Sequence, residues 1–146
     1  MLTELNTTPP AHLIGTPLML PLANARVIAG FPSPAEDTGY RQIDLTRELI
    51  THPQATFIVE VEGDSVRDFG IFHKDRLVVD KALEARHGDI VVAVVDNLFT
   101  VKKLYKRGGR VKLQAGNITY PDIVFKEGQT LVIWGVATFG ITQLRR

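Results

Sequence analysis

Two short segments of the sequence carry residues that could act together as a nucleophile and a base. Gly63-Asp64-Ser65 follows an apolar run, and a glycine at that point would let a strand end sharply and expose the serine hydroxyl. Lys102 and Lys103 are adjacent in a later apolar run. A serine hydroxyl is a weak nucleophile until a base takes its proton, and a neutral lysine amine can be that base. The residue types therefore indicate acyl-transfer chemistry by a serine and a lysine.

This chemistry requires a neutral lysine, which is rare at neutral pH. An unperturbed side chain has a pKa of ~10.4, so about one molecule in 2,500 carries the neutral amine at pH 7. Burial among apolar groups is the effect that lowers a lysine pKa enough. Strand alternation places Lys102 on one face with Leu98, Thr100 and Leu104, and Lys103 on the other with Phe99, Val101 and Tyr105, so both lysines have apolar companions.

The residue pattern alone leaves the choice between the two lysines open. Each could instead be an exposed edge lysine that discourages strand pairing. In the same way, Gly63-Asp64-Ser65 could be an ordinary turn.

The elements expected to position these residues are mainly β-strands. Runs of β-branched and aromatic residues, bounded by turn signals, predict strands at 56–62, 76–80, 89–95, 98–105, 110–114 and 130–138. Residues 44–52 carry a helical pattern of apolar residues, which Pro53 ends. Short connections and little helix favour a mostly β domain of antiparallel strands.

Residues 1–34 read as an extended, proline-rich N-terminal arm, and residues 35–146 as the domain. Six of the eight prolines fall in the arm, and because proline removes a backbone donor and fixes φ, no long helix fits there.

Ala29 and Gly30 are small residues in an extended stretch of this arm. Small side chains let a nucleophile approach a carbonyl carbon, so the pair is a candidate cleavage site. An ordinary loop leading into the domain is the alternative.

Composition excludes several other functions. The formal net charge is +1, which argues against a dedicated nucleic-acid binder. There is no cysteine, the four histidines lack ligand spacing, and no glycine-rich phosphate loop occurs, so we predict no metal site and no cofactor. No run approaches the ~18 apolar residues of a membrane span, so we expect no membrane insertion.

Six segments in a fixed order resemble the UmuD family, the self-cleaving subunits of error-prone polymerase V, which are related to the peptidase domain of LexA. The resemblance runs from about residue 28 to the C-terminus. The segments are Gly30-Phe-Pro-Ser-Pro-Ala35, Arg41-Gln-Ile-Asp-Leu45, His52-Pro53, Gly63-Asp-Ser65, His87-Gly-Asp-Ile90 and Phe99-Thr-Val-Lys-Lys-Leu104.

The resemblance implies a β-rich peptidase domain with a Ser-Lys dyad. It assigns the nucleophile to Ser65 and the base to Lys102, and it makes the backbone amides of Asp64 and Ser65 the expected oxyanion donors. The scissile bond maps to Ala29–Gly30. The sequence departs from the UmuD pattern at Val66, where the family usually has methionine, and at Ala29, where UmuD-like proteins commonly have cysteine.

The same resemblance implies a cytoplasmic protein of the bacterial SOS response. Cleavage would be stimulated by RecA filaments on single-stranded DNA. The shortened product would be a homodimer that joins an UmuC-like Y-family polymerase for translesion synthesis, without sequence-specific DNA binding of its own.

Three alternatives remain: a LexA-like regulator, a signal-peptidase-like protease acting on other proteins, and a non-catalytic interaction subunit. The 29 proline-rich residues before the bond are too few for a three-helix DNA-reading domain, which argues against the first.

Overall fold

The computed structural model describes residues 17–27, 29–30, 39–125 and 130–145. In chain order the strands are β1 (Met19–Ala23), β2 (Tyr40–Asp44), β3 (Thr56–Glu60), β4 (Arg76–Asp80), β5 (Ile90–Val95), β6 (Leu98–Arg107), β7 (Arg110–Gln114), β8 (Ile123–Val124) and β9 (Val132–Ile141). The helices are α2 (Leu45–Leu49) and the short 3-10 helices η2 (Pro53–Ala55) and η3 (Arg67–Phe69).

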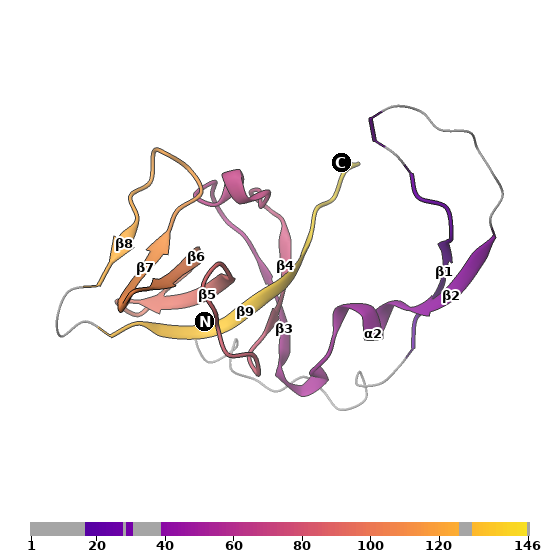
Figure 1. Cartoon of the computed structure of the whole chain (residues 1–146), viewed down its shortest axis with the longest axis horizontal. Coiled ribbons are helices and arrows are strands. Elements are labelled where there is room, and N and C mark those ends of the chain that lie inside the picture. Colours follow the sequence, from indigo (N-terminus) through magenta and orange to yellow (C-terminus); the bar gives the residue numbers. More distant parts are fainter. Residues whose placement is uncertain (1–16, 28, 31–38, 126–129, 146) are drawn as a thin grey trace.

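Seven of these strands form one antiparallel sheet, and the other two form a separate hairpin. The sheet order is β3-β4-β9-β5-β6-β7-β8, and β1 pairs with β2 alone. Figure 1 shows the sheet and the hairpin as two distinct parts joined through α2. The prediction of a mostly antiparallel β domain with little helix is confirmed.

The sheet is bent by two register shifts against β9. One lies between Val78 and Val79 of β4, and the other between Val92 and Ala93 of β5. An extra residue at such a point bends the strand and increases its twist. As a result β3 and β6, which are not neighbours in the sheet, line one common cleft.

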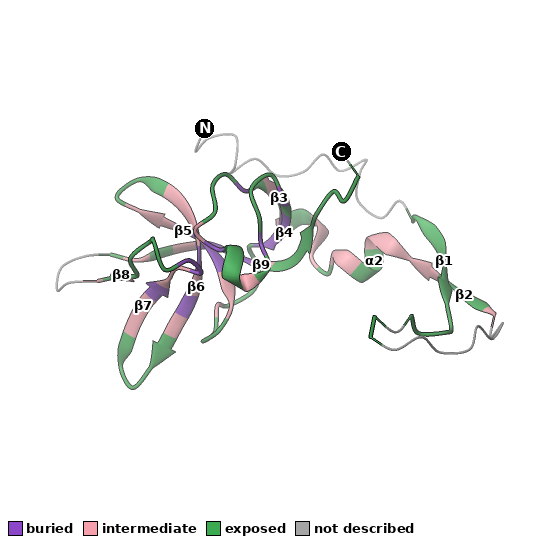
Figure 2. Ribbon diagram, turned by 90° about the horizontal axis from the view of Figure 1, so that it is seen from above, coloured by how far each residue is buried: buried purple, intermediate pink, exposed green. Residues whose placement is uncertain are grey.

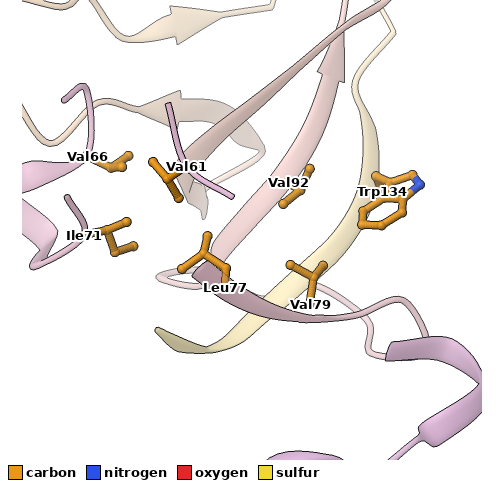
Figure 3. Close-up of a cluster of buried hydrophobic side chains, with 7 residues drawn as sticks. All are labelled: Val61, Val66, Ile71, Leu77, Val79, Val92 and Trp134. Atoms are coloured by element: carbon orange, nitrogen blue, oxygen red, sulfur yellow. The ribbon is translucent and has the colours of Figure 1, made fainter. Parts of the chain in front are cut away.

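Apolar side chains are buried on both faces of the central strands. One cluster, shown in Figure 3, consists of Val61, Val66, Ile71, Leu77, Val79, Val92 and Trp134. The other consists of Val91, Ala93, Leu104, Leu113 and Val136. Successive residues of β5 alternate between the two clusters, which is why this strand is an unbroken apolar run. The strands that carry the site therefore have a packed core on either side.

The observed elements differ from the predicted ones mainly at their ends. Strands β4 and β7 have the predicted bounds, whereas β3 ends at Glu60 and β6 and β9 continue to Arg107 and Ile141. The predicted helix over 44–52 is shorter, Leu45–Leu49. Asp44 caps it by accepting a hydrogen bond from the Thr46 amide (3.0 Å), and an extended backbone at Ile50 ends it.

The sequence did not predict the hairpin or the short strand β8. In the hairpin, Met19 faces Asp44 and Ala23 faces Tyr40, so residues of the predicted arm pair with residues of the predicted domain. Pro21 is accommodated because β1 pairs with a single strand in the part of the chain that the structure describes. Figure 2 shows this hairpin largely exposed. The boundary between residues 34 and 35 lies outside the described residues and stays a prediction.

Within the described ranges, no helix has the length and apolar character needed to cross a membrane.

Candidate active site

The turn that carries Ser65 is shaped by a glycine and anchored by a buried valine. Gly63 has φ +88°, a left-handed conformation that other residues adopt only with strain, and it lies in the bend that follows β3. Its amide donates a hydrogen bond to Nδ1 of His73 (2.9 Å). Val66 is 1% exposed and packs in the cluster with Val61 and Ile71 (Figure 3). Ser65 is thus held between an exposed turn and the core.

Lys102 projects from the middle of β6, where it is the partner of Val91 in β5. Its Nζ atom is hydrogen-bonded to Oγ of Ser65 at 2.8 Å, to Oγ1 of Thr100 at 3.1 Å and to the carbonyl oxygen of Val101 at 3.2 Å. Lysine is rarely this buried: only 7% of the residue is exposed. The structure therefore brings together the two side chains that the sequence proposed as nucleophile and base.

The surroundings of Lys102 favour its neutral form. Burial lowers the pKa of the Lys102 amine below its ordinary value, because the ammonium loses its hydration. Within the described part of the chain, no carboxylate forms an ion pair with this amine. A neutral amine at hydrogen-bond distance from a hydroxyl is suited to take its proton.

Lys103 has different surroundings. Its Nζ atom lies over the ring of Phe69, 4.8 Å from the ring centroid, which is a cation–π geometry. It lies on the opposite face of β6 from Lys102, as strand alternation requires. Of the two adjacent lysines, Lys102 is the one in contact with the serine.

A cleft of about 440 Å³ opens beside Ser65. Its lining residues come from β3 and the turn after it, from β5 and from β6: Ile58, Val59, Glu60, Val61, Glu62, Ser65, Val66, Val92, Phe99, Thr100 and Val101. Among the described residues, strand β3 is at the edge of the sheet and pairs only with β4, so its other edge can accept an additional strand. The cleft is therefore shaped for an extended, largely apolar peptide.

The two expected oxyanion donors, the amides of Asp64 and Ser65, lie in the turn itself. Within the residues that the structure describes, neither amide donates a hydrogen bond. The carbonyl groups of these two residues are occupied instead: Asn117 Nδ2 donates to the Asp64 oxygen (3.0 Å) and the Gly116 amide donates to the Ser65 oxygen (2.6 Å).

The predicted cleavage site is not brought to the dyad. Ala29 and Gly30 are exposed. Figures 1 and 2 show the β1–β2 hairpin, which precedes and follows them in the chain, at the opposite end of the molecule from β6. The nucleophile and base are in contact in this conformation, whereas the bond assigned to them is elsewhere.

Three contributors to the site were not predicted. Strand alternation predicted that Thr100 shares a face with Lys102, but not that its hydroxyl contacts the amine. Gly116 and Asn117 form a turn signal after β7, but such a signal does not reveal which segment the turn contacts. No group of three or more potential metal ligands is found among the described residues.

Known proteins resemble this chain over most of its length. The family model for Peptidase S24-like proteins matches residues 21–138. The chain is 42% identical to protein SamA of Salmonella typhimurium, with 86% of each chain covered, and 38% identical to protein MucA of Escherichia coli, with 85% of each covered. It is 40% identical to the LexA repressor of Shewanella woodyi over 81% of this chain and 57% of that repressor. The resemblance to UmuD and LexA is thereby confirmed, and the chain belongs to the Peptidase S24-like family.

Proposed function

We propose that this protein is a serine endopeptidase that cleaves itself at the Ala29–Gly30 bond, with Ser65 as nucleophile and Lys102 as general base. The observation that carries the proposal is the 2.8 Å hydrogen bond between the buried Lys102 amine and the Ser65 hydroxyl. Membership of the peptidase family supports the same reaction class.

Lys102 Nζ has three oxygen partners, which fit either the three donors of an ammonium or the two N–H donors and one lone pair of a neutral amine. The two donors are satisfied by Oγ1 of Thr100 and the carbonyl of Val101. Nζ donates to Oγ of Ser65 in the structure, and in the neutral amine the lone pair would take this third position and accept from the hydroxyl. The amine is thus oriented to receive the serine proton.

The reaction proceeds by acyl transfer. Lys102 takes the proton from Ser65 as Oγ bonds to the carbonyl carbon of Ala29, and the amides of Asp64 and Ser65 stabilise the negative charge on the carbonyl oxygen. The bond to the Gly30 nitrogen then breaks, and Lys102 gives that nitrogen the proton. Water, deprotonated by Lys102, hydrolyses the ester and restores Ser65, leaving one product with a carboxylate at Ala29 and the other with an amine at Gly30.

The arm has the properties of a substrate for this cleft. Ala29 and Gly30 leave room for the nucleophile, and Val27 before them is almost fully exposed and could enter an apolar cleft. Glu60 and Glu62 line that cleft, opposite in charge to Arg26.

The likeness to UmuD supports a wider role for the reaction. We place the protein in the bacterial cytoplasm, in the SOS response, with cleavage stimulated by RecA filaments on single-stranded DNA. The processed homodimer would then serve an UmuC-like, Y-family translesion polymerase. The similarity to SamA and MucA favours this role over that of a repressor.

The test is the mass of the product. Purified chain incubated at alkaline pH, or with RecA, ATP and single-stranded DNA, is expected to yield a fragment beginning at Gly30. Ser65→Ala and Lys102→Ala should abolish it, with rate losses of about a thousandfold or more. Lys103→Ala is the matched control and should cleave normally. Equal cleavage in Ser65→Ala and wild type would overturn the dyad, and an intact wild-type chain would favour the non-catalytic alternative.

A further inference from the structure

The loop that follows β7 makes several hydrogen bonds to the turn that carries the nucleophile. The Gly116 amide donates to the Ser65 carbonyl (2.6 Å), and the Gly116 carbonyl accepts from the Asp68 amide (2.7 Å). The Asn117 side chain donates from Nδ2 to the Asp64 carbonyl (3.0 Å). The Asp64 carboxylate nearby raises the pKa of the Tyr120 hydroxyl. We refer to residues 116–120 as the bracing loop.

The bracing loop approaches the turn as closely as a glycine allows. A Cβ atom at Gly116 would lie 2.7 Å from the ring of Phe69, in the 3-10 helix that follows Ser65. This close approach is what puts the Gly116 amide within reach of the Ser65 carbonyl. The contact between the two segments is therefore tight, and it is made through backbone.

Asn117 is the buried side chain of this loop, with 4% of the residue exposed. Its Oδ1 atom accepts from the amide (3.1 Å) and from the hydroxyl (2.8 Å) of Thr119. Because an amide N–H can only donate, these contacts fix which end of the side chain is oxygen, and Nδ2 must face the Asp64 carbonyl. Every polar atom of the Asn117 side chain has a defined partner.

The Asp64 carbonyl and the Ser65 N–H belong to the same peptide unit. In a trans peptide the C=O and N–H bonds point in opposite directions. Asn117 Nδ2 and the Arg67 amide (3.3 Å) both donate to that carbonyl and hold it on the side of the bracing loop. The Ser65 N–H is thereby turned away from the loop and left without an acceptor in the described part of the chain.

We propose that Asn117 is a positioning residue for catalysis, which orients the Asp64–Ser65 peptide so that the Ser65 N–H can stabilise the oxyanion. This inference rests on the proposed function. Asn117 acts through the peptide unit and does not touch the substrate. Donors fixed in direction before the reaction cost no reorganisation during it, so their orientation affects the rate and not the protonation of the base.

The test compares three variants with the wild-type chain in first-order self-cleavage from pH 7 to 11. Asn117→Ala removes the side-chain amide. Asn117→Asp keeps an oxygen for Thr119 but cannot donate to the Asp64 carbonyl. Thr119→Ala is the control, since it removes the hydroxyl contact and leaves the Asn117 donor in place.

We expect the plateau rate at high pH to fall about 10- to 100-fold in Asn117→Ala and Asn117→Asp, and less than threefold in Thr119→Ala. The pH at which Asn117→Ala reaches half of its own plateau should match that of wild type, because Lys102 keeps its surroundings. Thermal unfolding followed by circular dichroism should show all three variants folded at the assay temperature.

Each other outcome has a definite meaning. An unchanged plateau in Asn117→Ala, in a wild-type chain that cleaves, overturns the role of Asn117 and leaves the proposed function intact. A shifted half-plateau pH, or loss of the folded state in both Asn117 variants, also overturns it, because Asn117 would then act on Lys102 or on stability. A wild-type chain that does not cleave at any pH contradicts the proposed function itself.

Discussion

The amine of Lys102 has three oxygen partners but little contact with water. Its pKa is lowered by burial in the folded chain, whereas in the unfolded chain it returns to about 10.4. Between those two pKa values the unfolded state binds more protons than the folded state, so stability rises with pH across that window. Below the folded-state pKa both states are protonated and the cost of burying the charge is fully present. Burial of Lys102 therefore lowers the stability of the folded chain at neutral pH and makes the amine easier to deprotonate.

Lys102→Met should therefore raise the free energy of unfolding at pH 7, and this gain should shrink as the pH approaches 10.4. Urea denaturation at pH 7, 8.5 and 10, with every chain carrying Ser65→Ala so that none cleaves itself, measures both effects. Lys103→Met is the matched control, and its effect on stability should not follow this pH trend. A Lys102→Met chain that is less stable than wild type at pH 7 would show that the amine is not destabilised by burial.

At the scale of the element, strand β6 connects the catalytic chemistry to the core. Its side chains alternate between Lys102 and Leu104 on the buried face and Lys103 and Tyr105 on the other, half-buried face. Leu104 is 1% exposed and belongs to the second apolar cluster, whereas Leu98, on the same strand, is 71% exposed. Packing at Leu104 therefore fixes the register in which Lys102 meets Ser65, because a slip of one residue would exchange the two lysines.

Leu104→Ala should destabilise the domain by about 2–5 kcal/mol, the usual cost of a cavity at a buried leucine. Leu98→Ala should change stability by less than about 0.5 kcal/mol. Equilibrium unfolding in urea, with the two variants side by side, gives both values. Comparable losses at the two positions would mean that β6 is not packed as the structure shows.

At the scale of the whole molecule, the hairpin and the sheet are separate parts. The hairpin presents the exposed apolar side chains of Leu18, Met19, Leu20, Leu22 and Tyr40. It lies at the far end of the molecule from β6, as Figures 1 and 2 agree. An isolated two-stranded hairpin is only marginally stable in water, so this part is the one that can rearrange or exchange at low cost. The cleft beside β3, an edge strand in the described part of the chain, can then receive the arm of another copy.

We accordingly predict that one copy can cut another. Isotope-labelled Ser65→Ala chain, mixed with unlabelled wild type, should release a labelled fragment beginning at Gly30, at a rate that increases with wild-type concentration. Labelled Ser65→Ala alone should stay intact. Mass spectrometry separates the two populations, and a labelled chain that persists while wild type is cut would restrict cleavage to a single chain.

Local sequence patterns were sufficient to predict several strands and one turn of this protein. Alternating apolar runs and turn signals predicted β4 and β7 to the residue, and Gly63 marked the sharp turn before Ser65. These features depend on neighbouring residues, whose preferences are local. The β1–β2 hairpin was not predicted because its strands are separated by a long connection and because Pro21, within β1, argues against a strand there.

By itself the sequence determined the fold class and the candidate nucleophile, and its resemblance to UmuD singled out Lys102 from the two adjacent lysines. Only the tertiary structure showed the contact between Lys102 and Ser65, the loop that braces the turn of Ser65, and the position of the β1–β2 hairpin relative to both. The physical reason is distance along the chain: Lys102 is 37 residues from Ser65, and Asn117 is 53 residues from Asp64. Such contacts arise from the register and bending of the sheet, which are set by the packing of all its strands together.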